Sequence, residues 1–173
     1  DQNIKNLILD LRGNDGGDPF CSSYLLSYLE QESVPYFAHP YGRYTDLADP
    51  IPLAANNFTG NLYTLIYGSG FSTTGHFCAL LKYHNIGKFV GSETGATYTC
   101  TGSVRYVDLA HTKLILGTAR KRRYSAAVKN MDRTRGIIPD YQIEQSQHDI
   151  IEGRDTILEY VLNLIRTHHE NIN

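Results

Sequence analysis

Several features that mark particular classes of protein are missing from this sequence. The three cysteines, Cys21, Cys78 and Cys100, are widely spaced and include no C-x-x-C pair, so they predict neither a disulfide framework nor a zinc site. No stretch approaches the ~20 consecutive apolar residues that a membrane-spanning helix requires. We therefore expect no metal ion, no cofactor and no membrane span in this chain.

An excess of charge of either sign is also missing. The formal net charge is −2 and the sequence pI is about 6.4, so nucleic acid and acidic membrane surfaces are poor candidate partners. The one basic cluster, residues 120–123, is short, and we interpret it as a solvated strand end or turn. With 173 residues, 41% of them hydrophobic and 20% charged, the chain has the length and composition of one globular domain.

Short apolar runs alternate with segments of helical periodicity in the first half of the chain. Residues 6–11, 62–67 and 88–91 are predicted as strands, with one helix starting at Pro19 and another from about 73 to 84. Asp18 before Pro19 is a strong helix start. The apolar face of this helix, which should pack on the sheet, is predicted to consist of Phe20, Tyr24, Leu25, Tyr28 and Leu29. The alternation predicts an α/β domain with crossover helices.

The remaining segments have weaker patterns. Residues 33–61 are rich in proline and tyrosine and are predicted as loop with one short edge strand. Residues 103–109 and 113–118 are predicted as a β-hairpin, and a second edge strand should run through Ile143. A final amphipathic helix is predicted to begin near Asp155.

Ser72 is the first candidate for chemistry. It follows a predicted strand, on a glycine-flanked turn directly ahead of a predicted helix. A helix N-terminus supplies free N–H groups and the positive end of a dipole, both of which stabilise an oxyanion. Acyl transfer needs a nucleophile beside such donors. The structural alternative is that Ser72 or Thr73 caps the helix.

Gly16 and Gly17 are the second candidate. Glycines after a buried strand let backbone N–H groups approach a ligand without an intervening side chain, and these groups could donate to the carbonyl oxygen of a scissile peptide. The structural alternative is a tight turn that needs positive φ before the Asp18 cap.

Four elements in order resemble the motifs of the tail-specific, or C-terminal processing, family of serine peptidases. Residues 9–17 (LDLRGNDGG) are similar to its D-L-R-x-N-x-G-G signature, and residues 71–77 (FSTTGHF) are similar to its nucleophile turn and helix. Residues 90–95 (VGSETG) resemble its G-x-x-T-x-G segment. Residues 136–140 (GIIPD) and 153–155 (GRD) resemble its closing elements.

The resemblance implies a ClpP/crotonase-like α/β fold, a mixed sheet with crossover helices, in which residues 1–173 form a single catalytic-core domain of a longer protein. It also implies hydrolysis of a protein or peptide substrate through a serine acyl-enzyme, often near the substrate's C-terminus. Ser72 would attack, and the N–H groups of Gly16 or Gly17 and of Thr73 would hold the oxyanion. Members often carry an upstream PDZ domain and usually act outside the cytoplasm.

The chain departs from the family pattern at the general base and at the register of the nucleophile. Thr97 stands where the processing branch has its lysine, and no lysine follows before Lys113. Counting back from His76 makes Thr73 the alternative nucleophile, whereas Ser72 directly follows Phe71 at the turn.

Three residues are the main candidates to replace the missing lysine, and Lys82 and Lys129 could also reach the site. His76 lies four residues after Ser72 and can share its helical face, and a neutral imidazole accepts protons near neutrality. Glu93 lies on a loop that should approach the site. Asp132 matches an acidic residue in a branch that resembles the tricorn core protease. The structural alternatives are a packed helix histidine and two solvated carboxylates.

Three functions stay open on the sequence alone. The leading one is a serine endopeptidase. The second is a catalytically degenerate relative that binds a peptide or apolar ligand, which the missing lysine and the 13 tyrosines favour. The third is crotonase-type acyl-CoA chemistry, which shares the implied fold, and a shared fold does not fix function.

Overall fold

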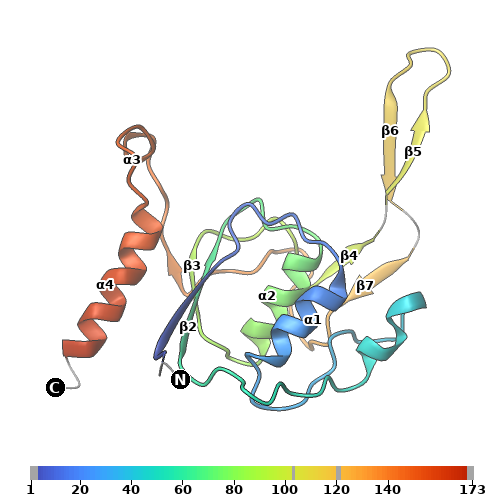
Figure 1. Ribbon diagram of the computed structural model, residues 1–173. Helices are drawn as coiled ribbons and strands as arrows, with labels where there is room; N and C mark the ends of the chain where they lie inside the picture. The colour runs from blue at the N-terminus through green and yellow to red at the C-terminus, as the bar shows by residue number, and fades with distance from the viewer. Residues whose placement is uncertain (1–3, 103, 120–121, 171–173) are drawn as a thin grey trace.

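The computed structural model describes residues 4–102, 104–119 and 122–170, and a four-stranded parallel sheet lies at its centre (Figure 1). The strands follow in the order β1 (Asn6–Asp10), β2 (Asn61–Ile66), β3 (Lys88–Gly91) and β8 (Tyr141–Gln142). Parallel neighbours need long crossover connections. Helix α1 (Pro19–Ser27) lies in the connection from β1 to β2, and α2 (Thr73–Tyr83) lies in the connection from β2 to β3. The predicted α/β class is therefore confirmed.

Alternate residues of β2 face opposite sides of the sheet, and both sides are covered. Leu62 and Ile66 belong to the larger hydrophobic core, together with residues of α1 and α2. Leu65 packs instead with Ile157 and Val161 of α4 (Thr156–Glu170). Figure 1 shows α4 on one side of the sheet and α1 and α2 on the other. A strand that is covered on both faces has a fixed position, and this strand leads into the turn that carries Ser72.

Helix α2 is surrounded by the core. Every residue from Thr73 to Leu81 is buried, including the polar residues of its first turn. The N-terminal end of this helix therefore has a fixed position relative to the sheet.

The predicted mixed sheet is observed as a parallel sheet with two separate antiparallel pairs. β4 (Thr99–Thr101) pairs with β7 (Arg123–Ser125), and β5 (Val104–Asp108) pairs with β6 (Ile115–Ala119). The second pair is the predicted hairpin, apart from Ser103, which lies outside the described residues. The first pair was not predicted, because strands of three residues are too short to show a period.

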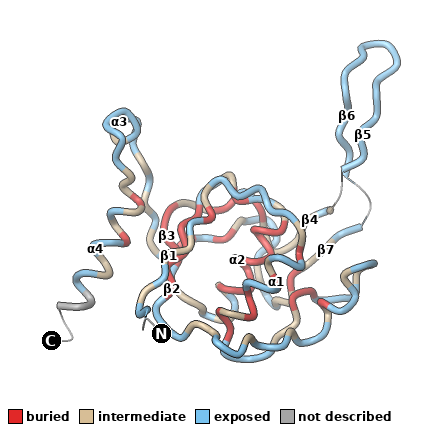
Figure 2. Tube along the Cα trace, viewed as in Figure 1, coloured by how far each residue is buried: buried red, intermediate tan, exposed pale blue. Residues whose placement is uncertain are grey.

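The β5–β6 hairpin extends away from the rest of the described chain, and every residue of its two strands is exposed (Figure 2). Tyr106 lies opposite Gly117, and Val107 lies opposite Leu116. Because successive side chains of a strand point to opposite faces, apolar side chains lie on both faces of this hairpin. In the basic cluster, Arg122 is exposed and Arg123 begins β7, while residues 120 and 121 lie outside the described part of the chain.

The face that α1 buries differs from the predicted one. Ser23, Leu26 and Ser27 are buried, whereas Phe20 and Tyr24 of the predicted apolar face are 41% and 66% exposed. Ser23 and Ser27 lie against the loop before β2, because they line a cavity with residues 51–56 and the Ser27 carbonyl oxygen accepts the Ala54 N–H. The Tyr24 ring stacks edge-on with Tyr28. The loop therefore covers a side of α1 that the apolar pattern did not indicate.

One arginine ties the C-terminal part of the chain to the end of β1. Arg12 forms ion pairs of 2.7 Å with both Asp10 and Asp155, and Asp155 in turn accepts a hydrogen bond from the Leu158 N–H in the first turn of α4. A short helix that was not predicted, α3 (Gln147–Ile151), precedes this contact and begins with a capping box. No helix in the described part of the chain is long and apolar enough to cross a bilayer.

Between α1 and β2 the chain forms a 3-10 helix, η1 (Gly42–Ala48), and otherwise irregular structure. Isolated bridges join Pro35 to Pro50 and Phe37 to Ala126, and Phe37 is fully buried. This segment is therefore a loop that contributes to the core, with bridges in place of the predicted short edge strand.

Glu30 is a buried acid just beyond the end of α1, at a cavity of about 540 Å³. Its Oε1 has no hydrogen-bond partner among the described residues and lies 3.9 Å from Nε2 of His84. Burial raises the pKa of Glu30 to about 7, and burial also lowers the pKa of His84. Both groups are therefore held toward their uncharged forms.

Replacing Glu30 by glutamine is expected to flatten the pH dependence of stability. The pKa of this carboxyl group is raised from 4.5 to about 7 on folding, so the folded state loses stability as the pH rises through this interval. The full shift corresponds to about 3 kcal/mol, and solvent screening at the cavity reduces it, so Glu30→Gln should be more stable than the wild type by about 1–2 kcal/mol at pH 8, but not at pH 4. Urea unfolding at both pH values measures the effect, with the exposed Glu152→Gln as control. Parallel pH profiles for wild type and Glu30→Gln would contradict this account.

Candidate active site

The turn after β1 and the turn after β2 are in direct contact. A Cβ atom added to Gly16 would lie 2.8 Å from the carbonyl oxygen of Phe71, 2.8 Å from the amide nitrogen of Thr73 and 2.9 Å from Cβ of Ser72. Such distances leave no room for a side chain, and Gly16 also has a φ of +92°. The turn at Gly16 and Gly17 (the glycine corner) and the turn at residues 71–73 (the Ser72 turn) are therefore brought together by backbone contact, as the family resemblance implied.

Ser72 has a backbone conformation that is rare for a residue with a side chain. Its φ is 53° and its ψ is −122° at the N-cap position of α2, and its side chain makes no capping hydrogen bond. A non-glycine residue in such a region costs about 1–3 kcal/mol. The structural alternative, in which the Ser72 hydroxyl caps the helix, is not observed. Its hydroxyl instead lines a cavity beside the glycine corner.

Thr73 uses its hydroxyl differently. Thr73 is buried, and its Oγ1 donates a 2.8 Å hydrogen bond to the carbonyl oxygen of Gly17. This bond joins the first turn of α2 to the glycine corner. The hydroxyl of Thr73 is therefore already engaged, whereas that of Ser72 faces a cavity.

Two of the backbone N–H groups that have no acceptor among the described residues flank the Ser72 cavity from different turns. They belong to Gly17 and to Thr73, the first residue of α2. The N–H of Gly16 is not available, because it donates to Oδ1 of Asn14 at 2.9 Å. A helix N-terminus adds the positive end of its dipole to such donors. The geometry therefore offers Gly17 and Thr73, rather than Gly16, as donors to an anionic oxygen.

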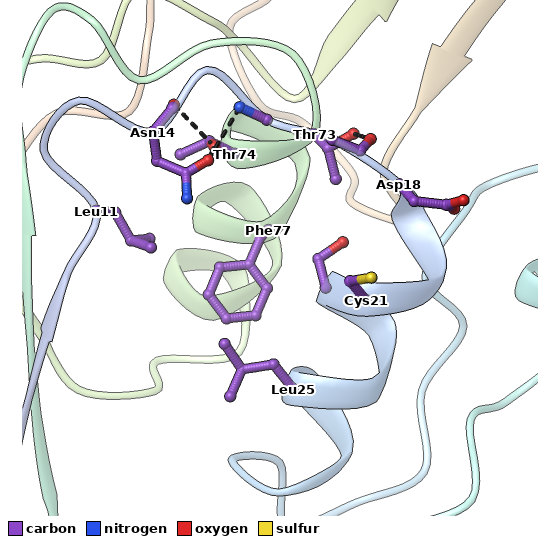
Figure 3. A pocket seen from close by; sticks show the side chains of 11 residues that line it. Leu11, Asn14, Asp18, Cys21, Leu25, Thr73, Thr74 and Phe77 are labelled. Atoms are coloured by element: carbon purple, nitrogen blue, oxygen red, sulfur yellow. Dashed lines mark hydrogen bonds between the residues drawn. The ribbon is translucent and has the colours of Figure 1, made fainter.

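Two cavities flank the contact between Gly17 and Thr73, and both residues line each of them. The first, of about 200 Å³, is shown in Figure 3 and has the apolar side chains of Leu11, Leu25 and Phe77 in its wall. The second, of about 130 Å³, contains Ser72 and is otherwise lined by Gly17, Pro19, Phe37, Tyr44, Thr73, His76, Cys100, Gly102 and Tyr124.

His76 lies in the wall of the second cavity, but its imidazole is bound to another part of the chain. Its Nε2 lies 3.2 Å from the carbonyl oxygen of Tyr124, which can only accept, so the hydrogen is on Nε2. Nδ1 is buried and has no partner among the described residues. Burial lowers the pKa of His76 to about 4. The structure thus shows the packed, hydrogen-bonded helix histidine that the sequence analysis gave as the alternative.

Cys100 is a residue of this site that the sequence analysis did not identify. Its Sγ lies 3.5 Å from Nε2 of His76, and burial raises the pKa of its thiol while a hydrogen bond with the Ser72 side chain opposes this shift. Cys100 is on β4 and Tyr124 is on β7. Because neither short strand was predicted, nothing in the sequence placed these residues beside Ser72.

Glu93 and Asp132 interact with their own neighbours. Glu93 forms an ion pair of 2.6 Å with Arg135 and accepts a hydrogen bond from the Gly136 N–H, and these bonds lower the pKa of Glu93. Asp132 accepts from the hydroxyl and the N–H of Thr134, which lowers the pKa of Asp132. Neither carboxylate lines the two cavities beside Ser72.

Thr97, the residue at the position of the family lysine, lies beside α2. A Cβ added to Gly75, in the first turn of α2, would be 2.5 Å from the carbonyl oxygen of Thr97. The Thr97 hydroxyl donates to the carbonyl oxygen of Thr99. Thr97 lines neither of the two cavities. The described residues contain no group of three or more potential metal ligands.

Comparison with known proteins connects this geometry to a family. The sequence profile of peptidase family S41 matches residues 1–143. The solved structure of mature CPAF complexed with lactacystin is similar with a TM-score of 0.68 and 16% identity, over 97% of this chain and 45% of that chain. A protein from Parabacteroides merdae ATCC 43184 is similar with a TM-score of 0.67 and 23% identity, over 93% of this chain and 52% of that one. The tricorn protease gives a TM-score of 0.57 at 19% identity, over 94% of this chain and 15% of that one.

These structural likenesses are all below 25% identity and show a shared fold. The chain spans about half the length of the Parabacteroides merdae protein and less of the other two. No curated protein sequence matches the chain.

Replacing Gly16 by alanine is expected to force the two turns apart. The new Cβ would collide with backbone atoms of residues 71–73, and overpacking of this kind costs about 1–3 kcal/mol beyond the strain of positive φ. Gly13→Ala is the matched control, because Gly13 also has positive φ but has no atom within 4 Å of an added Cβ. Urea unfolding should show Gly16→Ala to be the less stable variant by at least the collision cost. Equal losses in the two variants would contradict the close contact.

Proposed function

Because the chain belongs to peptidase family S41, we propose that it is a serine endopeptidase that hydrolyses peptide bonds through an acyl-enzyme on Ser72. The observation that supports this most directly is the position of the Ser72 hydroxyl. It makes no capping bond, it lines a cavity, and it lies at the contact where the N–H groups of Gly17 and Thr73 have no acceptor among the described residues. A nucleophile beside free backbone donors is the arrangement that acyl transfer requires.

In the proposed reaction, Oγ of Ser72 attacks the carbonyl carbon of a peptide bond and releases its proton to solvent water, while the carbonyl oxygen becomes an oxyanion. The N–H groups of Gly17 and Thr73 donate to that oxygen. The intermediate then collapses as the peptide nitrogen takes a proton from solvent and departs as the amine, and a water molecule hydrolyses the resulting ester to a carboxylate and the free Ser72 hydroxyl. A single donor of this type is typically worth about 100- to 1000-fold in rate.

Ser72 is a better nucleophile than Thr73 on structural grounds. The Thr73 hydroxyl donates to Gly17 and is buried, so its use in catalysis would break the bond that joins the two turns. The Ser72 side chain makes no capping bond and, among the described residues, shares a hydrogen bond only with the Cys100 thiol, which joins neither turn to the other, and its strained backbone conformation is typical of residues at functional sites.

The proposed substrate is a protein or peptide, cleaved near its C-terminus as in the family that the chain resembles. The described residues beside Ser72 include no lysine, and the imidazole of His76 is hydrogen-bonded to Tyr124. The proposal therefore assigns the nucleophile and the oxyanion donors to this chain and assigns no proton acceptor among the described residues.

A second candidate function is peptide binding without turnover. Two observations favour it: threonine at position 97 in place of lysine, and the lowered pKa of His76, which makes its imidazole a weak base. The two functions differ in whether the Ser72 hydroxyl reacts.

Covalent labelling distinguishes these functions. A fluorophosphonate should react with the wild-type protein, and peptide mass spectrometry should locate the adduct on Ser72. Ser72→Ala should lose labelling by at least 100-fold, because it lacks the nucleophile. Thr73→Val, which keeps the Thr73 N–H, should still be labelled on Ser72.

The controls distinguish a nucleophile that is misassigned by one residue from a protein that binds peptides without cleaving them. An adduct on Thr73, or labelling that persists in Ser72→Ala and disappears in Thr73→Val, would show that the nucleophile is misassigned by one residue. Absence of labelling in the folded wild type, with a peptide bound but not cleaved, would establish the binding function instead.

A further inference from the structure

Asn14 is hydrogen-bonded to the turn that carries Ser72, and the sequence did not predict these contacts. Its side-chain Oδ1 accepts the Gly16 N–H at 2.9 Å and the Thr74 hydroxyl at 2.7 Å. Its backbone carbonyl oxygen accepts the Phe71 N–H at 3.2 Å and lies 3.1 Å from Oγ1 of Thr74. Asn14, two residues before the glycine corner, is thus hydrogen-bonded to residues on both sides of Ser72.

The donors around Asn14 fix how its side-chain amide is oriented. A backbone N–H can only donate, so the atom that faces the Gly16 N–H must be the oxygen of the amide. That oxygen then faces Thr74 as well, and its second donor is the Thr74 hydroxyl. Figure 3 shows the nitrogen of Asn14 turned away from Thr74. A single acceptor therefore joins a backbone amide of the corner to a side chain of α2.

This arrangement determines which amides stay available. Gly16 and Gly17 are adjacent, and rotation of the peptide group before Gly16 or of the one before Gly17 could present either N–H group to an oxyanion. Because the Gly16 N–H is held by Asn14, only the Gly17 N–H stays free beside that of Thr73. The Thr73 hydroxyl holds the other side of the same corner through the Gly17 carbonyl oxygen.

We propose that Asn14 and Thr74 act together as positioning residues, which hold the Gly16 amide and so set the Gly17 and Thr73 amides for the oxyanion. This inference rests on the proposed function for its catalytic consequence, and its hydrogen-bond geometry is tested without it. Neither residue touches the reacting atoms in this role. Loss of the pair should therefore lower the rate of the chemical step and leave ground-state binding nearly unchanged.

A pair of conservative variants tests the role of the Thr74 hydroxyl. Thr74→Val has the same shape without the hydroxyl, and Thr74→Ser keeps the hydroxyl. With a fluorophosphonate, whose phosphoryl oxygen occupies the oxyanion position, Thr74→Val should lower the maximal inactivation rate constant about 10- to 100-fold. Its apparent binding constant should change less than about threefold. Thr74→Ser should keep most of the wild-type rate.

Thr64→Val is the matched control for removal of a buried hydroxyl. Thr64 lies on β2, is fully buried, and has a hydroxyl without a hydrogen-bond partner among the described residues. Its replacement should leave the inactivation rate unchanged. Equal inactivation rates for Thr74→Val and Thr74→Ser, in a wild type that is labelled on Ser72, would overturn the positioning role.

Hydrogen exchange of the glycine amides tests the geometry itself. In the folded wild type, nuclear magnetic resonance should show the Gly16 amide exchanging about 10-fold more slowly than the Gly17 amide, because only Gly16 is hydrogen-bonded. Asn14→Ala should bring Gly16 to the rate of Gly17, and Thr74→Val should accelerate Gly16 more than Thr74→Ser does. Equal exchange of Gly16 and Gly17 in the wild type would overturn the inference. Slow exchange of Gly16 in a wild type that is not labelled on Ser72 would uphold the hydrogen bond and count against the proposed function alone.

Discussion

Gly16 lies so close to residues 71–73 that van der Waals contact, and not only hydrogen bonding, sets the distance between the two turns of the candidate site. The rest of the site depends on this contact. It brings Gly17 and Thr73 together in the wall of the cavity that Ser72 also lines, and both residues line the other cavity as well. Hydrogen bonds can lengthen with little cost, whereas overlapping backbone atoms repel steeply. Repulsion therefore sets the minimum distance between the Gly17 and Thr73 N–H groups, and the hydrogen bonds of Asn14 and Thr73 set the maximum distance.

The contact arises from the topology of the sheet. β1 and β2 are parallel neighbours, so the turns that follow them emerge at the same edge. The pairing continues one residue past β1, because the Leu11 N–H donates to the carbonyl oxygen of Leu65. β2 is buried on both faces and α2 on all sides, so the Ser72 turn is held between two elements that have little freedom to move. The strained conformation of Ser72 is tolerated because the surrounding elements determine it.

The sequence predicted the parts of the molecule that depend on local pattern. The three principal strands, the starts of α1 and α2 and the hairpin follow from apolar runs, glycine turns and the Asp18 cap, and the meeting of the two turns was implied by the family resemblance. Side-chain partners could not be predicted in this way. Glu93 is turned to Arg135 by an ion pair that spans 42 residues, and His76 is bound to the carbonyl oxygen of a strand that is only three residues long. Asn14 lies within the segment 9–17 that resembles a family motif, but its contacts depend on donors from a turn far along the chain, so the sequence did not single it out.

The positive φ of Ser72 means that the residue that would make the fold more stable at this position is not the residue that carries a hydroxyl. Glycine adopts such a conformation without the penalty of a side chain, so a chain under no demand for a hydroxyl would become more stable with glycine at position 72. Drift toward greater stability would thus remove the proposed nucleophile first and leave the sheet, the helices and the glycine corner intact. A descendant that had lost its chemistry could keep the whole architecture of this site and differ from its ancestor by a single hydroxymethyl group.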